Sequence, residues 1–445
     1  MITPKLKEMW VANGTKYGKT IAAVNAFVVK VPITSGAVFR WIAPIYSQTF
    51  IAYRYARRFL PKSRHIIFNK SEPSIVFDPI STRWEFRTGK DPESLEGEAT
   101  AGNILDECSK MTEEVYASVK TTVTVTKGPI LAISTPRGKN WFHTRCMAAK
   151  EEMDWCLKNG KTPHRIFLTA PTIDNPYVDK RVIDDAQKSL PRRLFQQYFL
   201  AQFVDDGGTF ADFRKCFYTE RLDLDVGQEK WFDPTMPKTS DGKYDCKIIN
   251  AADRAKKIDF TVFTAWDYKR KRLVGFWRFQ GVNYIQAIQK VYHFGNQFKT
   301  VELLIHDQTG IGEVIGDLLD KTNFPYQGIT FTSKNKTFMV NNLIIAFEQG
   351  EPQIPYWPDM IVELDSYEVQ TNEIGSMKFS APTGMHDDIV SSMILGWAAV
   401  SDYSSSEMSV KIIEELKNQS QISSDWVNEY EDEEIIPWES QILKP

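Results

Sequence analysis

The sequence lacks any long hydrophobic run, and this excludes one class of protein at the outset. No apolar stretch approaches the roughly 20 residues that a helix needs to cross a bilayer, so we expect no membrane span. The opening residues MITPKLKEMW contain neither an apolar core nor a cleavage site, which argues against a secretory signal. A length of 445 residues is enough for two domains.

Cysteine and net charge are also scarce. The five cysteines are scattered without a Cys-x-x-Cys pair, at Cys108, Cys146, Cys156, Cys216 and Cys246. This usage is typical of a reducing compartment and gives no support for structural zinc or a disulfide framework. The formal net charge of -3 argues against a protein that simply coats nucleic acid. Two basic clusters, at 53–65 and 267–272, fit either solvated surface or a local track for a polyanion.

Strand-like and helix-like segments alternate over the first two hundred or so residues. Apolar runs at 37–44, 101–107 and 128–135 each stop at a polar or proline-bearing turn, and helical patterns occupy 19–30 and 47–60. The alternation predicts a parallel sheet with active loops at the carboxyl ends of its strands. The stretch 204–243 is rich in Asp, Gly, Pro, Ser and Thr and predicts a linker region.

A different order of elements follows the linker. Three strands, the last two joined by a tight turn, predict a meander at 247–253, 259–268 and 272–279. The elements expected after it are a helix at about 284–293, a strand at 301–307, a helix at about 311–321, a strand at 328–332 and helices at 334–349 and 387–400. From residue 401 the sequence is Ser-rich and then acidic, which predicts a mobile interaction tail.

Residues 13–20 read NGTKYGKT and differ from the phosphate-loop pattern G-x-x-x-x-G-K-[ST] at the first position. In such a loop, backbone N–H groups and a helix N-terminus surround a phosphate, while Lys19 would reach the outer phosphates and Thr20 would bind Mg²⁺. Asn13 replaces a glycine, and Asn is the other residue that best tolerates left-handed backbone angles. By itself, the stretch also fits an ordinary turn.

Two later segments favour the nucleotide site. NILDE (103–107) predicts an apolar strand ending in Asp106, which would orient Mg²⁺, and Glu107, which would polarise the attacking water. A solvated strand end would also explain two acids, but their place in the same alternating domain favours catalysis. The strand at 128–135 ends in Ser134 and Thr135, whose hydroxyls could sense the γ-phosphate.

Carboxylates mark the ends of several elements in the second half. Asp253 and Asp307 end predicted strands, Asp387 and Asp388 open the last helix, and Asp259 follows Asp253 by six residues. Aspartate is also a common cap and turn residue, so each one alone could be structural. The order of elements resembles the ribonuclease H-like arrangement, in which such carboxylates converge. Converging carboxylates are stable mainly with divalent cations, and two cations can clamp the reacting oxygens of a phosphodiester.

Together these motifs resemble the large terminase subunit of tailed bacteriophages, a DNA-packaging motor with an ATPase and a nuclease. The resemblance covers roughly residues 10–400 and extends to APIYSQ (43–48), DPESLEGE (91–98), DNPYV (174–178), QFVDDGGTF (202–210), AADRAKKIDFTVF, HDQTGIGE and GMHDDIV. It implies an α/β fold: a P-loop NTPase domain with a parallel-rich sheet at 1–203, a linker region at 204–243, a ribonuclease H-like mixed-sheet nuclease domain at 244–400 and an acidic tail at 401–445.

The resemblance also implies residue roles and cofactors. ATP with Mg²⁺ would bind at Asn13, Gly14, Thr15, Lys16, Tyr17, Gly18, Lys19, Thr20 and Asp106. Glu107 would be the catalytic glutamate, and Ser134 and Thr135 would couple hydrolysis to movement. Two divalent cations, Mg²⁺ or Mn²⁺, would be held in the nuclease by Asp253, Asp307 and Asp387, with Asp388 beside them. The family usually has glycine and arginine where Asn13 and Lys16 stand, and lysine cannot form arginine's bidentate fork.

The implied partners are double-stranded DNA, the portal protein and the small terminase subunit. The resemblance further implies that the protein forms a homo-oligomeric ring on the prohead and is a monomer when free. It would be found in the host cytoplasm and transiently at the portal, would not be part of the mature virion, and would not associate with a membrane. The acidic segment 425–439 is a candidate docking segment. Two alternatives stay open: a helicase-like or recombination ATPase with a fused nuclease, and a degenerate ATPase that serves as an assembly scaffold.

Overall fold

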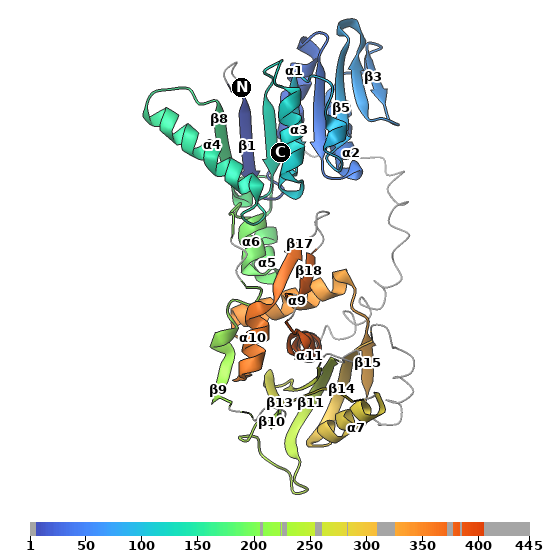
Figure 1. The fold of residues 1–445 in the computed structure, drawn as a ribbon, viewed down its shortest axis with the longest axis vertical. Coiled ribbons are helices and arrows are strands. Elements are labelled where there is room, and N and C mark those ends of the chain that lie inside the picture. The colour runs from blue at the N-terminus through green and yellow to red at the C-terminus, as the bar shows by residue number, and fades with distance from the viewer. Residues whose placement is uncertain are drawn as a thin grey trace, which may run out of the picture. The chain divides into compact units, whose positions relative to one another are not determined.

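The computed structural model describes residues 6–204, 208–222, 224, 229–253, 260–282, 284–308, 325–371, 377–382 and 385–404. The chain divides into two compact units, one within Met1–Lys215, Ile344–Gly350 and Leu364–Met385, and the other within Cys216–Leu343, Glu351–Glu363 and His386–Pro445. Each unit has its own sheet and its own core (Figure 1). The predicted helix at 311–321, Asp259 and the tail beyond residue 404 lie outside the described residues.

The first unit is built on an eight-stranded sheet with the order β3-β4-β5-β2-β6-β7-β1-β8. Its strands are β1 (Glu8–Asn13), β2 (Val38–Ala43), β3 (Ile66–Asn69), β4 (Ser74–Phe77), β5 (Thr82–Thr88), β6 (Gly102–Asp106), β7 (Ile130–Ser134) and β8 (Arg165–Ala170). The strands from β5 to β8 in this order are parallel, whereas β3 and β4 form an antiparallel edge. The predicted parallel-rich sheet is therefore confirmed.

Helices cover both faces of this sheet and bury a core on each: α1 (Lys19–Lys30) and α2 (Tyr46–Phe59) on one face, α3 (Glu113–Thr122) and α4 (Trp141–Lys158) on the other. The helices α5 (Lys180–Ser189) and α6 (Arg192–Tyr198) pack in a small separate core. Adjacent residues of β1 belong to opposite cores. Val11 packs in one core with Phe27 of α1, whereas Trp10 packs in the other with Tyr116 of α3 and Phe142 of α4. Because side chains of a strand alternate between faces, β1 is buried on both sides and its carboxyl end is held firmly.

The second unit contains a six-stranded mixed sheet with the order β10-β13-β12-β11-β14-β15. Its strands are β10 (Lys230–Phe232), β11 (Tyr244–Asp253), β12 (Thr261–Asp267), β13 (Arg272–Phe279), β14 (Phe298–Asp307) and β15 (Tyr326–Ile329). The predicted meander is β11-β12-β13, and β14 runs parallel to β11 on its other side. This order, with the first strand of the meander beside the fourth, is that of a ribonuclease H-like sheet, as predicted.

The remaining described elements are α7 (Tyr284–Gly295), α9 (Ser333–Gln349), α10 (Pro358–Ser366), α11 (Asp388–Ser404) and two small strand pairs, β9 (Phe217–Arg221) with β16 (Ile354–Tyr356) and β17 (Glu368–Thr371) with β18 (Met377–Ser380). The α11 helix extends to Ser404, beyond the predicted end at 400. Among the described residues, no helix is both long and apolar enough to span a bilayer.

The stretch predicted as a linker contains regular structure. β9 and β10 both lie within it, and β10 pairs with β13. Phe210 is buried against Phe347 and Tyr367. These strands are short and their partners lie far along the chain, so no local periodicity could reveal them. The domain boundaries given from the sequence stay predictions.

Candidate functional site

The phosphate loop joins the end of β1 to the start of α1. Asn13 is the last residue of β1 and pairs with Ala170 of β8. The left-handed backbone positions of the loop are Lys16, with φ 56°, and Gly18, with φ 94°. The tolerance of Asn for left-handed angles was therefore the wrong reason to accept Asn13, because that residue does not adopt them. Its substitution for glycine is accommodated by an ordinary strand end.

The side chain of Lys19 lies inside the loop. Its ammonium is 3.0 Å from the carbonyl oxygen of Asn13 and 2.9 Å from that of Gly14. It also donates to Thr135 Oγ1 at 3.0 Å. The predicted phosphate-binding lysine and one predicted coupling hydroxyl thus touch, although the two residues are 116 positions apart.

Thr20 and Asp106 also meet in this site. Thr20 Oγ1 is 3.5 Å from Asp106 Oδ1 and 3.4 Å from Oδ2, which is long for a hydrogen bond. A hydroxyl and a carboxylate supply the hard oxygen donors that Mg²⁺ prefers. This donor set fits the predicted magnesium site.

The order of the strands explains why these residues meet. β7 lies between β1 and β6, with Ala12 opposite Ser134 and Ile133 opposite Asp106. Parallel strands end at the same edge of the sheet, so the loop, the acidic strand end and the coupling hydroxyls share one edge.

Burial changes the protonation chemistry of this edge. Desolvation lowers the pKa of Lys19, an effect that the carboxylates of Glu107 and Asp106 oppose. Burial, followed by the charge of Glu107, raises the pKa of Asp106 to about 7, although Lys19 and Thr20 favour its ionised form. A cation beside Asp106 would replace the proton that the bare carboxyl retains.

Glu107 follows β6 in a strained conformation. Its φ is 52°, in the left-handed region, and its Oε2 lies 3.1 Å from the Lys110 ammonium. A non-glycine residue keeps a left-handed backbone conformation only where the surrounding structure holds it there, and such residues are found often at functional sites. The turn carries Glu107 out of the strand, so its side chain is less buried than that of Asp106.

Ser109 connects this turn to the coupling strand, a role that the sequence analysis missed. Ser109 Oγ lies 2.7 Å from Ser134 Oγ and donates to the Thr135 carbonyl at 3.0 Å. Asn140, the N-cap of α4, donates through Nδ2 to the Ser109 carbonyl at 2.9 Å. A polar residue three positions after an acid is common in turns, so the sequence carried no signal for this link.

In the second unit, two predicted aspartates end neighbouring strands. Asp253 is the last residue of β11 and Asp307 the last residue of β14. The strands are parallel, and Ala252 lies opposite His306. Asp253 and Asp307 are the next residues of these two strands, so both lie at the same carboxyl edge of the sheet.

The start of α11 is anchored close to that edge. Asp388 is the first residue of α11, preceded by Asp387. Further along the helix, Ser392 Oγ donates to the Ala251 carbonyl of β11 at 3.2 Å. Asp388 Oδ2 also lies 3.6 Å from His386 Nδ1.

The buried carboxylate of Glu363 caps α11. Its Oε2 accepts the backbone N–H of Ile389 at 2.8 Å and of Val390 at 3.3 Å. Burial raises the pKa of Glu363 to about 8, although Arg278 opposes this. Glu363 lies more than twenty positions before Asp387 and more than fifty after Asp307, and no local sequence pattern marks it.

The aspartates lie at the same edge of the sheet, but the described residues do not form a preassembled metal-binding site. In the part of the chain that the structure describes, no three His, Cys, Asp or Glu side chains are grouped closely enough to hold a metal ion. Ionised carboxylates repel one another, so such a group is stable mainly when cations are bound. The carboxylate oxygens fit a hard divalent cation by their chemistry, and the three-ligand cluster stays a prediction.

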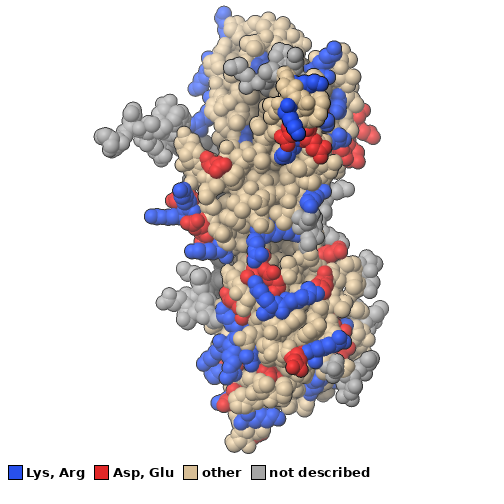
Figure 2. Space-filling model, turned by 90° about the vertical axis from the view of Figure 1, so that its left-hand side faces the viewer, with Lys and Arg blue, Asp and Glu red and all other residues tan. Residues whose placement is uncertain are grey.

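Charged side chains are dispersed over the surface. On the face drawn in Figure 2, Lys and Arg lie in small groups with Asp and Glu among them. The Lys and Arg side chains of the basic cluster at 53–65 are exposed, and Arg57, Lys62 and Arg64 line a surface hollow of about 460 Å³ with Phe68. None of these three cations has an ion-pair partner among the described residues.

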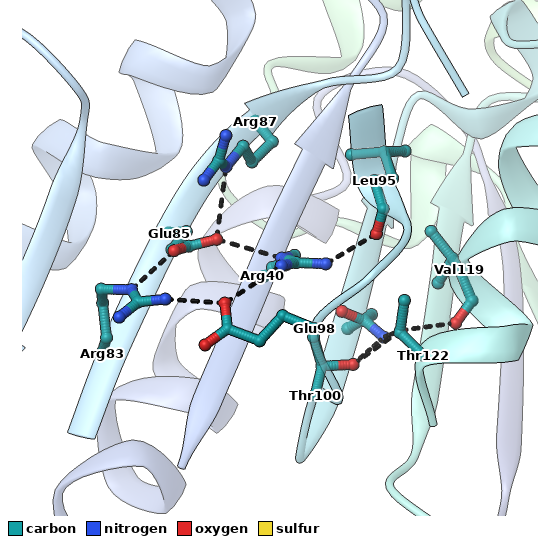
Figure 3. Close-up of polar contacts among 10 residues, drawn as sticks. Arg40, Arg83, Glu85, Arg87, Leu95, Glu98, Thr100, Val119 and Thr122 are labelled. Atoms are coloured by element: carbon teal, nitrogen blue, oxygen red, sulfur yellow. Dashed lines mark hydrogen bonds and ion pairs between the residues drawn. The ribbon is translucent and has the colours of Figure 1, made fainter. Parts of the chain in front are cut away.

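A second charged group joins β2 to β5 in the first sheet, and its central pair, Arg40 and Glu85, is buried (Figure 3). Arg40 of β2 donates from Nε to Glu85 of β5 at 3.0 Å and from Nη1 to the Leu95 carbonyl at 2.7 Å. Glu85 also accepts from Arg83 and Arg87. Burial alone would raise the pKa of Glu85, but the hydrogen bonds from the three arginines hold it below its usual range.

Comparison with known proteins gives two relatives of the same kind. The chain is 24% identical to the large terminase subunits of Thermus virus P23-45 and Thermus phage G20c over 319 residues, which are 69% of this chain and 63% of each relative. The match thus spans less than two thirds of the length of these relatives. No protein-family model matches the chain.

Solved structures are also similar, at a low level. A large terminase from a thermophilic bacteriophage is 15% identical, with a TM-score of 0.48, over 88% of this chain and 94% of that chain. The large terminase nuclease of thermophilic phage G20c is 18% identical, with a TM-score of 0.38, over 43% of this chain and 98% of that chain. The sequence relatives confirm the resemblance that the motifs indicated: this chain is similar to the large terminase subunits of tailed bacteriophages.

Proposed function

We propose that this protein is the large terminase subunit of a phage packaging motor, which hydrolyses ATP to move double-stranded DNA into a capsid and cleaves the DNA concatemer. The observation that carries the proposal is the meeting of Lys19 with Thr135 and of Thr20 with Asp106 at one sheet edge. Three segments that were predicted to belong to one ATPase site meet at this edge. If residues 13–20 formed only an ordinary turn, contacts with Asp106 and Thr135 would not be expected.

The first unit would bind and hydrolyse ATP with Mg²⁺. Lys19 and the N-terminus of α1 would hold the phosphates, and Thr20 and Asp106 would hold the cation. Glu107, turned out of β6, would orient the attacking water. On nucleotide binding, Lys19 would exchange its hydrogen bond to Thr135 for one to a phosphate. Thr135, which directly follows β7, would thus lose this bond when nucleotide is present. The Mg²⁺ supplies charge neutralisation for the phosphates.

The ATPase assignment is tested by steady-state hydrolysis of ATP. We expect Lys19→Ala and Glu107→Gln each to lower kcat at least about 100-fold, the usual loss when one group that acts on the transition state is removed. Lys158→Ala, at the exposed end of α4, is the matched control and should keep the wild-type rate. Wild-type protein without ATP turnover would favour the scaffold alternative.

The second unit would cleave DNA. Asp253, Asp307 and Asp387, with Asp388 beside them, would hold two Mg²⁺ or Mn²⁺ ions at the carboxyl edge of β11 and β14. Two such ions stabilise the attacking and leaving oxygens of a phosphodiester. The anchoring of α11 on β11 through Ser392 supports a shared site.

Nuclease activity is tested on plasmid DNA with Mn²⁺. Asp253→Asn and Asp307→Asn should each abolish cleavage while the ATPase rate stays at the wild-type level, because the two sites lie in different units. Asp241→Asn, an exposed turn residue of the second unit, should cut normally. Normal cleavage by both site variants would refute the metal-site assignment.

Double-stranded DNA, the portal protein, the small terminase subunit and a homo-oligomeric ring are the proposed partners and assembly. The exposed cations around Arg57 support a contact with the DNA backbone that ignores base sequence. A packaging motor should leave a forked duplex intact in the presence of ATP. Unwinding of that fork would favour the helicase-like alternative.

A further inference from the structure

We propose that Thr172 and Asn175 are positioning residues that hold the backbone of the phosphate loop in its nucleotide-binding shape. The inference rests on the proposed ATPase function and deepens it. Both residues follow β8, and Asn175 belongs to the DNPYV stretch (174–178), to which the sequence analysis gave no role.

The loop has a backbone shape that needs outside support. Lys16 has a φ of 56°, which residues with a Cβ atom disfavour, and such a residue persists only where its surroundings fix it. No side chain caps the N-terminus of α1. The N–H groups at the start of α1 therefore stay available for an anion, and other contacts must set the loop.

Two side chains bind consecutive carbonyls of the loop. Thr172 Oγ1 donates to the Thr15 carbonyl at 2.8 Å, and Asn175 Nδ2 donates to the Lys16 carbonyl at 2.7 Å. On the same side, the Thr15 N–H donates to the Tyr198 carbonyl at 2.6 Å. Residues after β8 and at the end of α6 thus hold the outer side of the loop.

The contact is also closely packed. Thr172 is fully buried, and its N–H donates to the Phe199 carbonyl at 2.6 Å. A Cβ atom placed on Gly14 would lie 2.4 Å from Thr172 Oγ1 and 2.9 Å from the Phe199 oxygen. The start of the loop therefore lies directly on this support, with no room to shift toward it.

The orientation of the Asn175 amide is fixed by a second bond. Its Oδ1 accepts the N–H of Tyr177 at 3.0 Å, so its NH₂ group is the one that faces Lys16. Aspartate at this position would keep the bond to Tyr177 and lose the donor to Lys16. This substitution also adds a negative charge beside the loop, so Thr172→Val, which removes one hydroxyl without a charge, isolates a contact with the loop.

Because Thr172 and Asn175 hold the carbonyls of Thr15 and Lys16 on the outer side of the loop, the N–H groups of the loop would be free to face the phosphates. A row of such N–H groups is an anion-binding nest, which loses affinity when its backbone is free to rotate. Losing one of the two bonds should thus weaken nucleotide binding and leave the chemical step and the fold largely unchanged.

The test is a titration of full-length protein with a fluorescent ATP analogue, alongside KM and kcat for ATP. Asn175→Asp and Thr172→Val should each raise Kd and KM about 5- to 10-fold, the equivalent of one lost hydrogen bond, with kcat within about twofold of wild type. Thr172→Ser keeps the hydroxyl and should restore the wild-type Kd. If Asn175→Asp does not fold, Asn175→Ala replaces it.

The matched control is Asn159→Ala. Asn159 donates to the Trp155 carbonyl at 2.7 Å at the end of α4, and its loss should leave Kd unchanged. A wild-type Kd in both site variants, or an equal loss in Asn159→Ala or Thr172→Ser, would overturn the proposal. Nucleotide binding without turnover in the wild type would refute the ATPase function and leave this inference standing, whereas absence of binding would refute both.

Discussion

At the residue scale, the phosphate loop differs from the usual pattern in a way that its backbone explains. The first position, Asn13, ends a strand and needs no special angles, whereas Lys16 occupies the left-handed position that glycine would fill more easily. The residue that carries the conformational cost is therefore Lys16. If the loop binds nucleotide as we propose, the positive charge of Lys16 would lie near the phosphates.

Glu85 is a residue on which stability should depend. Glu85→Gln keeps the shape of the side chain but leaves the buried Arg40 with the half-exposed Glu98, 3.4 Å away, as its carboxylate partner, so we expect a loss of about 3 kcal/mol at pH 7. Glu98 pairs with Arg83 at 2.7 Å and with Arg40 at the longer distance of 3.4 Å, and its side chain is 47% exposed, so Glu98→Gln should cost less than about 1 kcal/mol. Urea unfolding of the three proteins provides the comparison.

The pH dependence of this loss follows from the direction of the shift. The arginines hold the pKa of Glu85 below its usual range, so the folded protein releases this proton more readily than the unfolded chain does. The stabilisation is fully present above the unfolded pKa of about 4.3 and is lost as pH falls through the folded pKa. The difference between wild type and Glu85→Gln should hence shrink below about pH 4. A difference that stays constant in acid would contradict the ion-pair explanation.

At the scale of elements, the packing of α11 on the second sheet determines where Asp387 and Asp388, at the start of this helix, lie. Gly396 lies inside this helix, where a Cβ atom would come 2.4 Å from Trp266 Nε1 of β12 and 3.3 Å from the Ala251 side chain of β11. Glycine is thus required by the close approach of helix and sheet, and not by a turn.

Gly396→Ala should separate α11 from the sheet and displace Asp387 and Asp388. Helix propensity alone predicts that alanine stabilises the helix by about 1 kcal/mol, whereas overpacking predicts a loss of about 1–3 kcal/mol. We expect a lower unfolding midpoint and reduced Mn²⁺-dependent cleavage, with unchanged ATP turnover. An increase in stability would show that α11 can move away from the sheet at little cost.

At the scale of the whole molecule, a net charge of -3 must be reconciled with the DNA binding that we propose. Local cations without carboxylate partners, such as those around Arg57, can contact phosphates although the chain as a whole is slightly acidic. Binding of this kind releases counterions and depends on salt more than on sequence.

The affinity for a short duplex should fall at least tenfold between about 50 and about 200 mM salt and should not depend on base sequence. The combined variant Arg57→Ala, Lys62→Ala and Arg64→Ala should flatten the plot of log K against log salt by about two to three units of slope. Arg145→Ala, whose side chain already pairs with Glu113, is the control with an unchanged slope. An unchanged slope in the triple variant would exclude this surface from the DNA contact.

Much of the fold could be predicted because its signals are local. The strands β2, β6 and β7 are short apolar runs with clear stops, and α1 and α2 carry helical patterns, so each was placed to within about two residues. The elements that were missed depend on distant partners. β10 is three residues long and is defined by its pairing with β13, and β9 is defined by its pairing with β16.

By itself, the sequence determined which chemical groups the protein carries and in which order, because residue types and spacing are enough to recognise a phosphate loop, an acidic strand end and strand-terminal aspartates. Only the tertiary structure decided which of them meet. The insertion of β7 between β1 and β6 brings Thr135 to Lys19, and Thr172 and Asn175 reach the loop from more than 150 positions away. The order of strands in a sheet and hydrogen bonds across such distances are set by packing of the whole unit, which no local pattern records.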